Sequence, residues 1–125
     1  MKTISSFSSK LLAFTLALTA SLSTFASDDH SNFLCYTILT DSTVAVTGQS
    51  EYKTVPRYEY LPEDLVIPHE VTLQGKTYKV VSIDQWAFYA CTMLKSVTIP
   101  SSVTFIGLSA FQYCENLVNV DIPTS

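Results

Sequence analysis

The chain has 125 residues, with 7 Lys and Arg against 11 Asp and Glu, and a formal net charge of −4 at pH 7. An acidic chain lacks the basic footprint that binding to nucleic acid or to an anionic membrane requires. Its three cysteines are an odd number, which argues against a complete disulfide framework.

Residues 1–26 have the layout of a secretory signal peptide. Residues 1–10 hold two lysines and no acidic residue, an apolar run follows at Leu11–Ala20, and residues 21–26, which end at Ala26, are mainly small. The run is too short to span a bilayer, so we expect cleavage after Ala26; an uncleaved anchor is the alternative. Cleavage would leave 99 residues (125 − 26), the size of one small domain, without a further membrane-spanning segment.

The segment after the leader is predicted to be irregular and then β-rich. Residues 27–33 are polar and predict a flexible N-terminus. Leu34–Leu39 and Val44–Thr47 are rich in β-forming residues and predict two strands joined by a turn. A loop with two prolines follows, before the strand-like Leu65–Pro68.

A β-hairpin is predicted directly after this strand. Val71–Leu73 and Thr77–Val81 flank Gly75, which supplies the positive φ that tight turns need. Leu65–Pro68 aligns with the strand segments of the repeat that follows. We therefore interpret residues 34–79 as a β-rich N-terminal cap that contains a degenerate first coil.

Residues 80–125 are two adjacent copies of a 23-residue repeat, Val80–Ser102 and Val103–Ser125. An apolar ladder at a fixed period of this length is typical of a solenoid, in which each repeat buries its core against the next. The ten identical positions are Val80/Val103, Ile83/Ile106, Ala87/Ala110, Phe88/Phe111, Cys91/Cys114, Leu94/Leu117, Val97/Val120, Ile99/Ile122, Pro100/Pro123 and Ser102/Ser125.

Each repeat is predicted to form one strand and one short helical segment. Leu94, Val97 and Ile99 form the strand half, and Pro100 ends it because proline cannot donate a ladder hydrogen bond. Phe88 and Cys91 are three residues apart, a spacing that suits one or two helical turns facing the core. Asp84 and its repeat partner Gly107 are of residue types that tolerate turn geometry.

The pattern I-x-x-x-A-F-x-x-C-x-x-L-x-x-V-x-I-P at this period resembles the BspA-like leucine-rich repeat proteins. The resemblance covers Val80–Ser125 closely and Leu65–Pro68 weakly. It implies an α/β repeat fold, a short leucine-rich-repeat solenoid of right-handed β/α coils with a β-rich N-terminal cap. It also implies exported, often cell-surface proteins of Bacteroidetes and other host-associated microbes. Such proteins adhere to host extracellular-matrix proteins or to other bacteria, and their repeats are not known as catalytic elements.

The chain departs from the family in having two full repeats, where members usually carry many. Stability normally needs three or more stacked units. One interpretation is a structural, N-terminal capped fragment of a larger surface protein with no binding activity of its own. The other is that a partner covers the outer coil; Val120 and Ile122 would then lie at an exposed strand edge, which predicts self-association.

Motifs for catalysis or cofactor binding are absent from the sequence. His30 and His69 belong to no triad or metal motif, and the glycines are too dispersed to cradle a phosphate. We therefore expect no enzyme activity, no cofactor and no metal. Cys91 and Cys114 hold the same repeat position; buried free thiols are the favoured interpretation, and a disulfide between stacked strands is the alternative.

A candidate binding face follows from strand geometry. If Val97, Ile99, Val120 and Ile122 point inward, the alternation of side chains sends their neighbours outward. This face would bind a protein or glycan ligand, although a plain solvated sheet is the simpler interpretation. Its residues are Asp64, Val66, Ser96, Thr98, Asn119 and Asp121.

Aromatic residues are the second set of binding candidates. Trp86 has Ser109 as its repeat partner, so the repeat does not require an aromatic there; it is either a binding hot spot or packs against the cap. Tyr52, Tyr58 and Tyr60 suit glycan stacking or packing over a small core. The favoured function is a secreted or cell-surface, adhesin-like, non-catalytic protein that recognises a host or bacterial protein or glycan.

Overall fold

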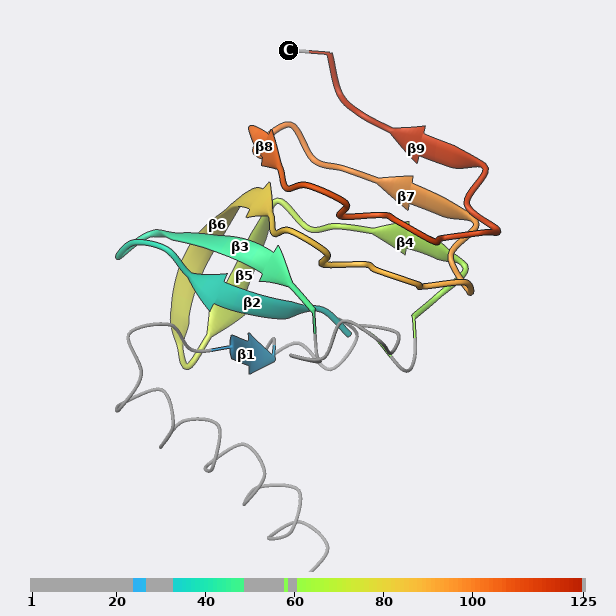
Figure 1. Cartoon of the computed structure of the whole chain (residues 1–125). Helices are drawn as coiled ribbons and strands as arrows, with labels where there is room; N and C mark the ends of the chain where they lie inside the picture. Colours follow the sequence, from blue (N-terminus) through green and yellow to red (C-terminus); the bar gives the residue numbers. More distant parts are fainter. Residues whose placement is uncertain (1–23, 27–32, 49–57, 59–60, 125) are drawn as a thin grey trace, which may run out of the picture.

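Figure 1 shows a computed structural model of the chain, which describes residues 24–26, 33–48, 58 and 61–124. Most of the predicted leader and of the predicted flexible N-terminus therefore lies outside the described residues. The end of the leader is an exception, because Thr24–Ala26 forms strand β1.

The N-terminal half of the described chain is β-rich, in agreement with the predicted strands. One sheet has the order β1-β2-β3-β6-β5, and a short strand, β8, also pairs with β6. Pairing is antiparallel between β1 and β2, between β2 and β3, and between β5 and β6, whereas β3 and β8 run parallel to β6. The strands are β2 (Cys35–Ile38), β3 (Thr43–Thr47), β5 (Glu70–Leu73), β6 (Lys76–Ile83) and β8 (Phe105–Ile106).

The predicted hairpin is confirmed. Leu73 pairs with Lys76, and the two residues between them, Gln74 and Gly75, have φ of 52° and 78°. Two successive positive φ values match the twist of a two-residue hairpin turn. Strand β6 continues beyond the predicted end to Ile83 and so passes from the hairpin into the repeats.

A second sheet stacks the strand half of each repeat. It has the order β4-β7-β9, with strands Asp64–Val66, Ser96–Thr98 and Asn119–Asp121. All pairing is parallel and in register, so that Leu65 lies beside Val97 and Val97 beside Val120. Figure 1 shows these three strands one above another, across the molecule from β6 and β8.

The first coil is longer than the sequence indicated. Val46 pairs with Ile83 as Ile83 pairs with Ile106. The same backbone hydrogen bond also occurs in both places. The N–H of Asp84 donates to the carbonyl of Val46 at 2.8 Å, and the N–H of Gly107 donates to the carbonyl of Ile83 at 2.7 Å. Strand β3 therefore opens the first coil, which β4 closes, and the described residues form three stacked coils, the number that a stable solenoid normally needs.

An aromatic column runs through all three coils. The rings of Tyr58 and Phe88 stack with centroids 5.4 Å apart, and those of Phe88 and Phe111 with centroids 5.1 Å apart. Tyr58 is buried; its hydroxyl donates to the carbonyl of Thr47 and accepts from the N–H of Cys35. For Tyr58 the packing interpretation is thus confirmed, while Tyr52 and Tyr60 lie outside the described residues.

The predicted helical half of each coil is not confirmed. Residues 85–90 and 108–113 form turns, and the described part of the chain contains no helix. Trp86 and Ala90 have φ of 57° and 58°, and their repeat partners Ser109 and Tyr113 have 57° and 62°. A left-handed residue cannot continue a right-handed helix, so each segment breaks at both positions.

The hydrogen bonds of this segment explain its shape. The N–H groups of Ala87, Tyr89 and Cys91 close local turns at 3.1–3.2 Å, each to the residue three positions earlier. The N–H groups of the alternate residues instead donate to carbonyl groups of the second repeat, at 2.8–3.2 Å. A helix would keep all of these bonds within the segment, whereas here every second one ties two coils together. The bonds between the coils are Trp86 to Leu108, Phe88 to Ala110 and Ala90 to Gln112.

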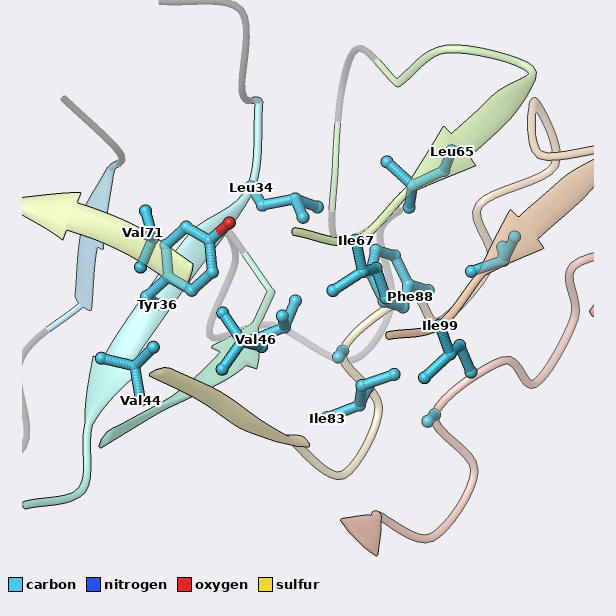
Figure 2. Close-up of a cluster of buried hydrophobic side chains, with 14 of the residues drawn as sticks. Leu34, Tyr36, Val44, Val46, Leu65, Ile67, Val71, Ile83, Phe88 and Ile99 are labelled. Carbon is cyan, nitrogen blue, oxygen red and sulfur yellow. The ribbon is translucent and has the colours of Figure 1, made fainter. Parts of the chain in front are cut away.

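The hydrophobic core lies between the two sheets. Figure 2 shows Val46 and Ile83 pointing toward Ile67, Phe88 and Ile99 from the opposite side. The core thins toward the second repeat: Ile99 is 3% exposed, whereas its repeat partner Ile122 is 58% exposed. Of the residues predicted to point inward, Val97 and Ile99 of the first repeat are therefore buried, whereas Val120 and Ile122 of the second repeat are not.

Candidate functional site

Six of the seven predicted binding residues lie on the outer face of the β4-β7-β9 sheet. The registers place Asp64, Ser96 and Asn119 in one row, and Val66, Thr98 and Asp121 in another. Between the rows, Leu65 and Val97 are buried and Val120 is half-buried. Ser96 is half-buried and the other five are exposed, so the rows form a continuous surface that solvent reaches.

Polar contacts link the first two strands of this face. The hydroxyl of Ser96 donates to Oδ1 of Asp64 at 2.6 Å, which holds the carboxylate over β7. Next to this pair, Nζ of Lys95 donates to Oε2 of Glu63 at 2.7 Å, and this contact raises the pKa of Lys95. Both members of the ion pair are exposed, so it contributes little to stability.

The third strand lacks such contacts among the described residues. Asn119 and Asp121 are exposed, and their side chains have no hydrogen-bond partner there. At the opposite corner, Val66 is 68% exposed and is the apolar member of the face. The face thus offers one free carboxylate, one amide, one hydroxyl and one apolar side chain on the same side of the sheet.

The repeats match a known family. Residues 69–125 match the model described as "BspA type Leucine rich repeat region (6 copies)". The chain carries BspA-type leucine-rich repeats. The fold resemblance extends beyond the matched residues, since strands β3 and β4, which form the first coil, precede them.

Solved structures of bacterial leucine-rich repeat proteins have a similar fold. A leucine-rich repeat protein from Bacteroides ovatus ATCC 8483 has a TM-score of 0.61 and 33% sequence identity. The match covers 77% of this chain and 24% of that protein. The T. pallidum leucine-rich repeat protein TpLRR has a TM-score of 0.58 and 27% sequence identity. The match covers 78% of this chain and 40% of TpLRR. A leucine-rich repeat protein from Bacteroides capillosus ATCC 29799 has a TM-score of 0.56 and 29% sequence identity. The match covers 71% of this chain and 60% of that protein. The chain thus spans less than two thirds of each relative, and no curated protein matches it significantly.

Trp86, the seventh candidate, is not part of the sheet face. It lies in the turn segment that follows β6, is half-buried, and donates its backbone N–H to Leu108 at 3.2 Å. Its left-handed φ is shared by Ser109 at the same place in the next BspA-type coil. The backbone at this position therefore serves the stacking of coils, whichever side chain it carries.

The repeated cysteines form no disulfide with each other in this structure. Cys91 is buried and Cys114 half-buried. The thiol of Cys114 donates to the carbonyl of Phe88 at 3.0 Å, and burial raises its pKa. Because a raised pKa keeps the thiol protonated, Cys114 is a weak nucleophile and acts as a small core residue of the BspA-type coil.

Neither a metal cluster nor a membrane helix occurs in the described ranges. They contain no group of three or more His, Cys, Asp or Glu side chains that could hold a metal ion. No helix long and apolar enough to cross a membrane occurs there. His69 is exposed and its carbonyl accepts the N–H of Val80 at 2.9 Å, while His30 is outside the described residues.

Two residues of this surface were missed by the sequence analysis, Glu63 and Lys95. Each lies directly before its strand, where the N–H of Lys95 donates to the carbonyl of Glu63 at 2.7 Å. Their opposite charges at equivalent places before β4 and β7 were a usable signal, but only once the two strands had been aligned. Val118 occupies the third place in this row and is 87% exposed.

Proposed function

We propose that this chain is an exported, non-catalytic repeat protein that binds a protein or glycan ligand on the outer face of β4-β7-β9. The observation that carries the proposal is the alignment of six predicted residues in two exposed rows. A rigid parallel sheet holds these groups in place before binding, which lowers the entropy cost of recognition. Membership of a repeat family with extended binding surfaces supports it.

Export to the outside of the cell is part of the same proposal. It is supported by the two lysines, the apolar run and the small residues of segment 1–26. It agrees with the resemblance to exported and cell-surface proteins that adhere to matrix proteins or to other bacteria. We therefore propose a host or bacterial surface component, such as an extracellular-matrix protein or a glycan, as the ligand.

The binding test uses the exported chain on an array of matrix proteins and glycans, followed by titration of whatever binds. Thr98→Ala removes an exposed hydroxyl from the middle of the face and is expected to weaken binding about 2- to 10-fold. Asp64→Asn removes a charge and is expected to have a larger effect on a polar ligand. Thr72→Ala is the matched control, because Thr72 is exposed on the distant strand β5.

A separate variant distinguishes the two predicted surfaces. If the sheet face binds the ligand, Trp86→Ala leaves the affinity unchanged while Thr98→Ala and Asp64→Asn lower it. The opposite pattern would reject the sheet face in favour of the turn segment. Equal affinity of all four variants and the parent chain would reject both surfaces.

A further inference from the structure

The charges on the β4-β7-β9 face are of one sign once its ion pair is set aside. Of the described lysines, only Lys95 lies beside this face, and its Nζ is 2.7 Å from Oε2 of Glu63. The other two belong to β6, across the molecule from the sheet (Figure 1). The carboxylates of Asp64 and Asp121 are therefore not balanced by a second described cation, so the face attracts cations and repels anions.

Asp64 is the carboxylate of this face that the structure holds in place. It lies beside Ser96 in the register of β4 and β7, and the Ser96 hydroxyl donates to its Oδ1 at 2.6 Å. The other carboxylate oxygen accepts no hydrogen bond from a described residue. Because the side chain is fixed before a ligand arrives, pairing with a cation costs it little conformational entropy.

Val66 lies two residues further along the same strand, and its side chain is on the same side of the sheet as that of Asp64. Its exposed fraction is 68%, the largest among the exposed large hydrophobic residues described before the second repeat; Phe33 and Leu39 have 50% and 47%. Its partner in the register, Thr98, is polar, so the repeat does not require an apolar residue there. Val66 therefore offers a ligand an apolar contact beside a fixed negative charge.

The spacing of these two side chains suits an extended polypeptide. Alternate residues of a strand share a side and lie about 6.6–6.8 Å apart. An extended segment laid along β4 has the same spacing, so a cationic residue over Asp64 places the residue two positions away over Val66. The hydroxyl, acetamido, carboxylate and sulfate groups of common glycans supply no such cation, whereas lysine and arginine side chains do.

We propose that the ligand of this face is a cationic polypeptide segment in extended conformation, with a lysine or arginine over Asp64 and an apolar side chain two residues away over Val66. The identity of this ligand rests on the proposed function of the face. Asp121, on the same side of the sheet, attracts a further cation of the segment. Sulfated and other anionic polymers are repelled by both carboxylates.

Three synthetic heptapeptides with blocked ends test the proposal, each titrated into the exported chain and followed by amide NMR shifts. The first, Ser-Lys-Ser-Leu-Ser-Lys-Ser, has leucine two residues from each lysine. The second, Ser-Lys-Leu-Ser-Ser-Lys-Ser, has the same composition, but its leucine points to the opposite side from both lysines when the peptide is extended. The third has glutamate in place of both lysines of the first peptide.

We expect the first peptide to bind and to shift amides of β4 and β7. The second should bind roughly 2- to 4-fold more weakly, since it loses an apolar contact about the size of one methylene group. The third should not bind detectably, because it brings two further negative charges to the face.

Variants of the chain assign the contacts. Asp64→Asn keeps an oxygen for the Ser96 hydroxyl but removes the charge, and should weaken the first peptide about 1.4- to 5-fold. Asp41→Asn is the matched control, because it changes the net charge equally at an exposed residue between β2 and β3. Val66→Thr keeps the shape of the side chain; it should weaken the first peptide roughly 2- to 4-fold and leave the second unchanged.

Absence of binding by the first peptide, or equal affinity for the first and third, would overturn the proposal. So would equal losses in Asp64→Asn and Asp41→Asn, which would assign the attraction to the net charge of the chain. A glycan from the array whose affinity falls with Thr98→Ala, but not with Asp64→Asn or Val66→Thr, would preserve the binding face and reject the cationic segment. An array ligand that all three of these variants bind as the parent chain does would reject the face itself.

Discussion

Gly107 lies so close to Gln85 that a Cβ built on the glycine would come within 2.3 Å of the Gln85 backbone nitrogen. The φ of Gly107 is not positive, in contrast to that of Gly75. The glycine is therefore needed for the close approach of two coils. The sequence interpretation, in which Gly107 is a residue suited to a turn, missed this role.

Replacing Gly107 by alanine is predicted to lower the free energy of unfolding by about 1–3 kcal/mol, because the methyl group forces the two coils apart. The shift would also weaken the bond from Gly107 to Ile83. Chemical denaturation measures the change. Gly75→Asn is the control: no atom lies within 4 Å of a Cβ there, and asparagine tolerates a positive φ. An equal loss at both glycines would contradict the explanation.

Ser109→Gly is predicted to raise the free energy of unfolding by roughly 0.5–1 kcal/mol. The φ of Ser109 is 57°, a conformation that costs an L-residue about 1–2 kcal/mol; glycine avoids this cost but loses part of the gain to its greater freedom when unfolded. Ser101→Gly, at an exposed turn residue without a positive φ, should lower stability slightly. Thermal unfolding of the two variants compares them, and the reverse order would be incompatible with strain at residue 109.

The aromatic column predicts unequal losses along its length. Phe88 is fully buried between two rings, so Phe88→Ala should cost about 3–5 kcal/mol. Phe111→Ala should cost less than half as much, because Phe111 is half-buried and stacks on one described ring only. The comparison is made by denaturation of dilute protein. A larger loss at Phe111 than at Phe88 would contradict this explanation.

Tyr58 should make stability fall at alkaline pH. Burial raises its pKa well above the usual value, so above about pH 10 the unfolded chain releases a proton that the folded chain retains. The contribution of Tyr58 to stability is therefore fully present below about pH 10 and is lost progressively as the pH rises above it. Tyr58→Phe should flatten this decline but cost about 1–3 kcal/mol at pH 7, since Cys35 and Thr47 lose their partner.

The control for this pH profile is Tyr113→Phe, at a ring that is 58% exposed. Its alkaline decline should match that of the parent chain. Unfolding midpoints between pH 8 and 11 give both profiles, and a decline that Tyr58→Phe leaves unchanged would assign the effect to other groups.

Mass spectrometry of the exported chain should find no bridge between Cys91 and Cys114. Alkylation of the folded protein should be slow at both, because one thiol is buried and the other has a raised pKa. In denaturant both should react quickly. A bridged peptide after digestion without reductant would show that the stacked thiols oxidise, although this structure has no disulfide between them.

The strands and the hairpin were predictable because their signals are local. Leu34–Leu39 and Val44–Thr47 carry β-forming residues, and Gly75 marks its own turn. The face residues were predictable as well, because alternation along a strand fixes which side chains share a side. The turns at residues 85–90 could not be predicted from the sequence. Trp86 and Ala90 have no intrinsic preference for a positive φ, and their conformation accompanies bonds to a coil 22 residues further along.

The extent of the first coil was hidden by changes in spacing. Val46 and Ile83 are 37 positions apart, and Tyr58 and Phe88 are 30 apart, where the repeat has 23. The β5–β6 hairpin accounts for part of the excess, and a longer connection between β3 and Tyr58 for the rest. A search for a fixed period therefore finds two coils, while the bonds of Val46 and the stacking of Tyr58 reveal a third.

The pairing of β1 with β2 gives the N-terminal processing of this chain a structural readout. Ala26, the residue before the expected cleavage, lies beside Cys35 at the end of β1. A peptidase that cut there would remove the whole of β1 and leave the outer edge of Cys35–Ile38 to water. Amide hydrogens on that edge would then exchange faster in the processed chain than in its precursor. Exchange at β2 would therefore report, residue by residue, which form of the protein a preparation contains.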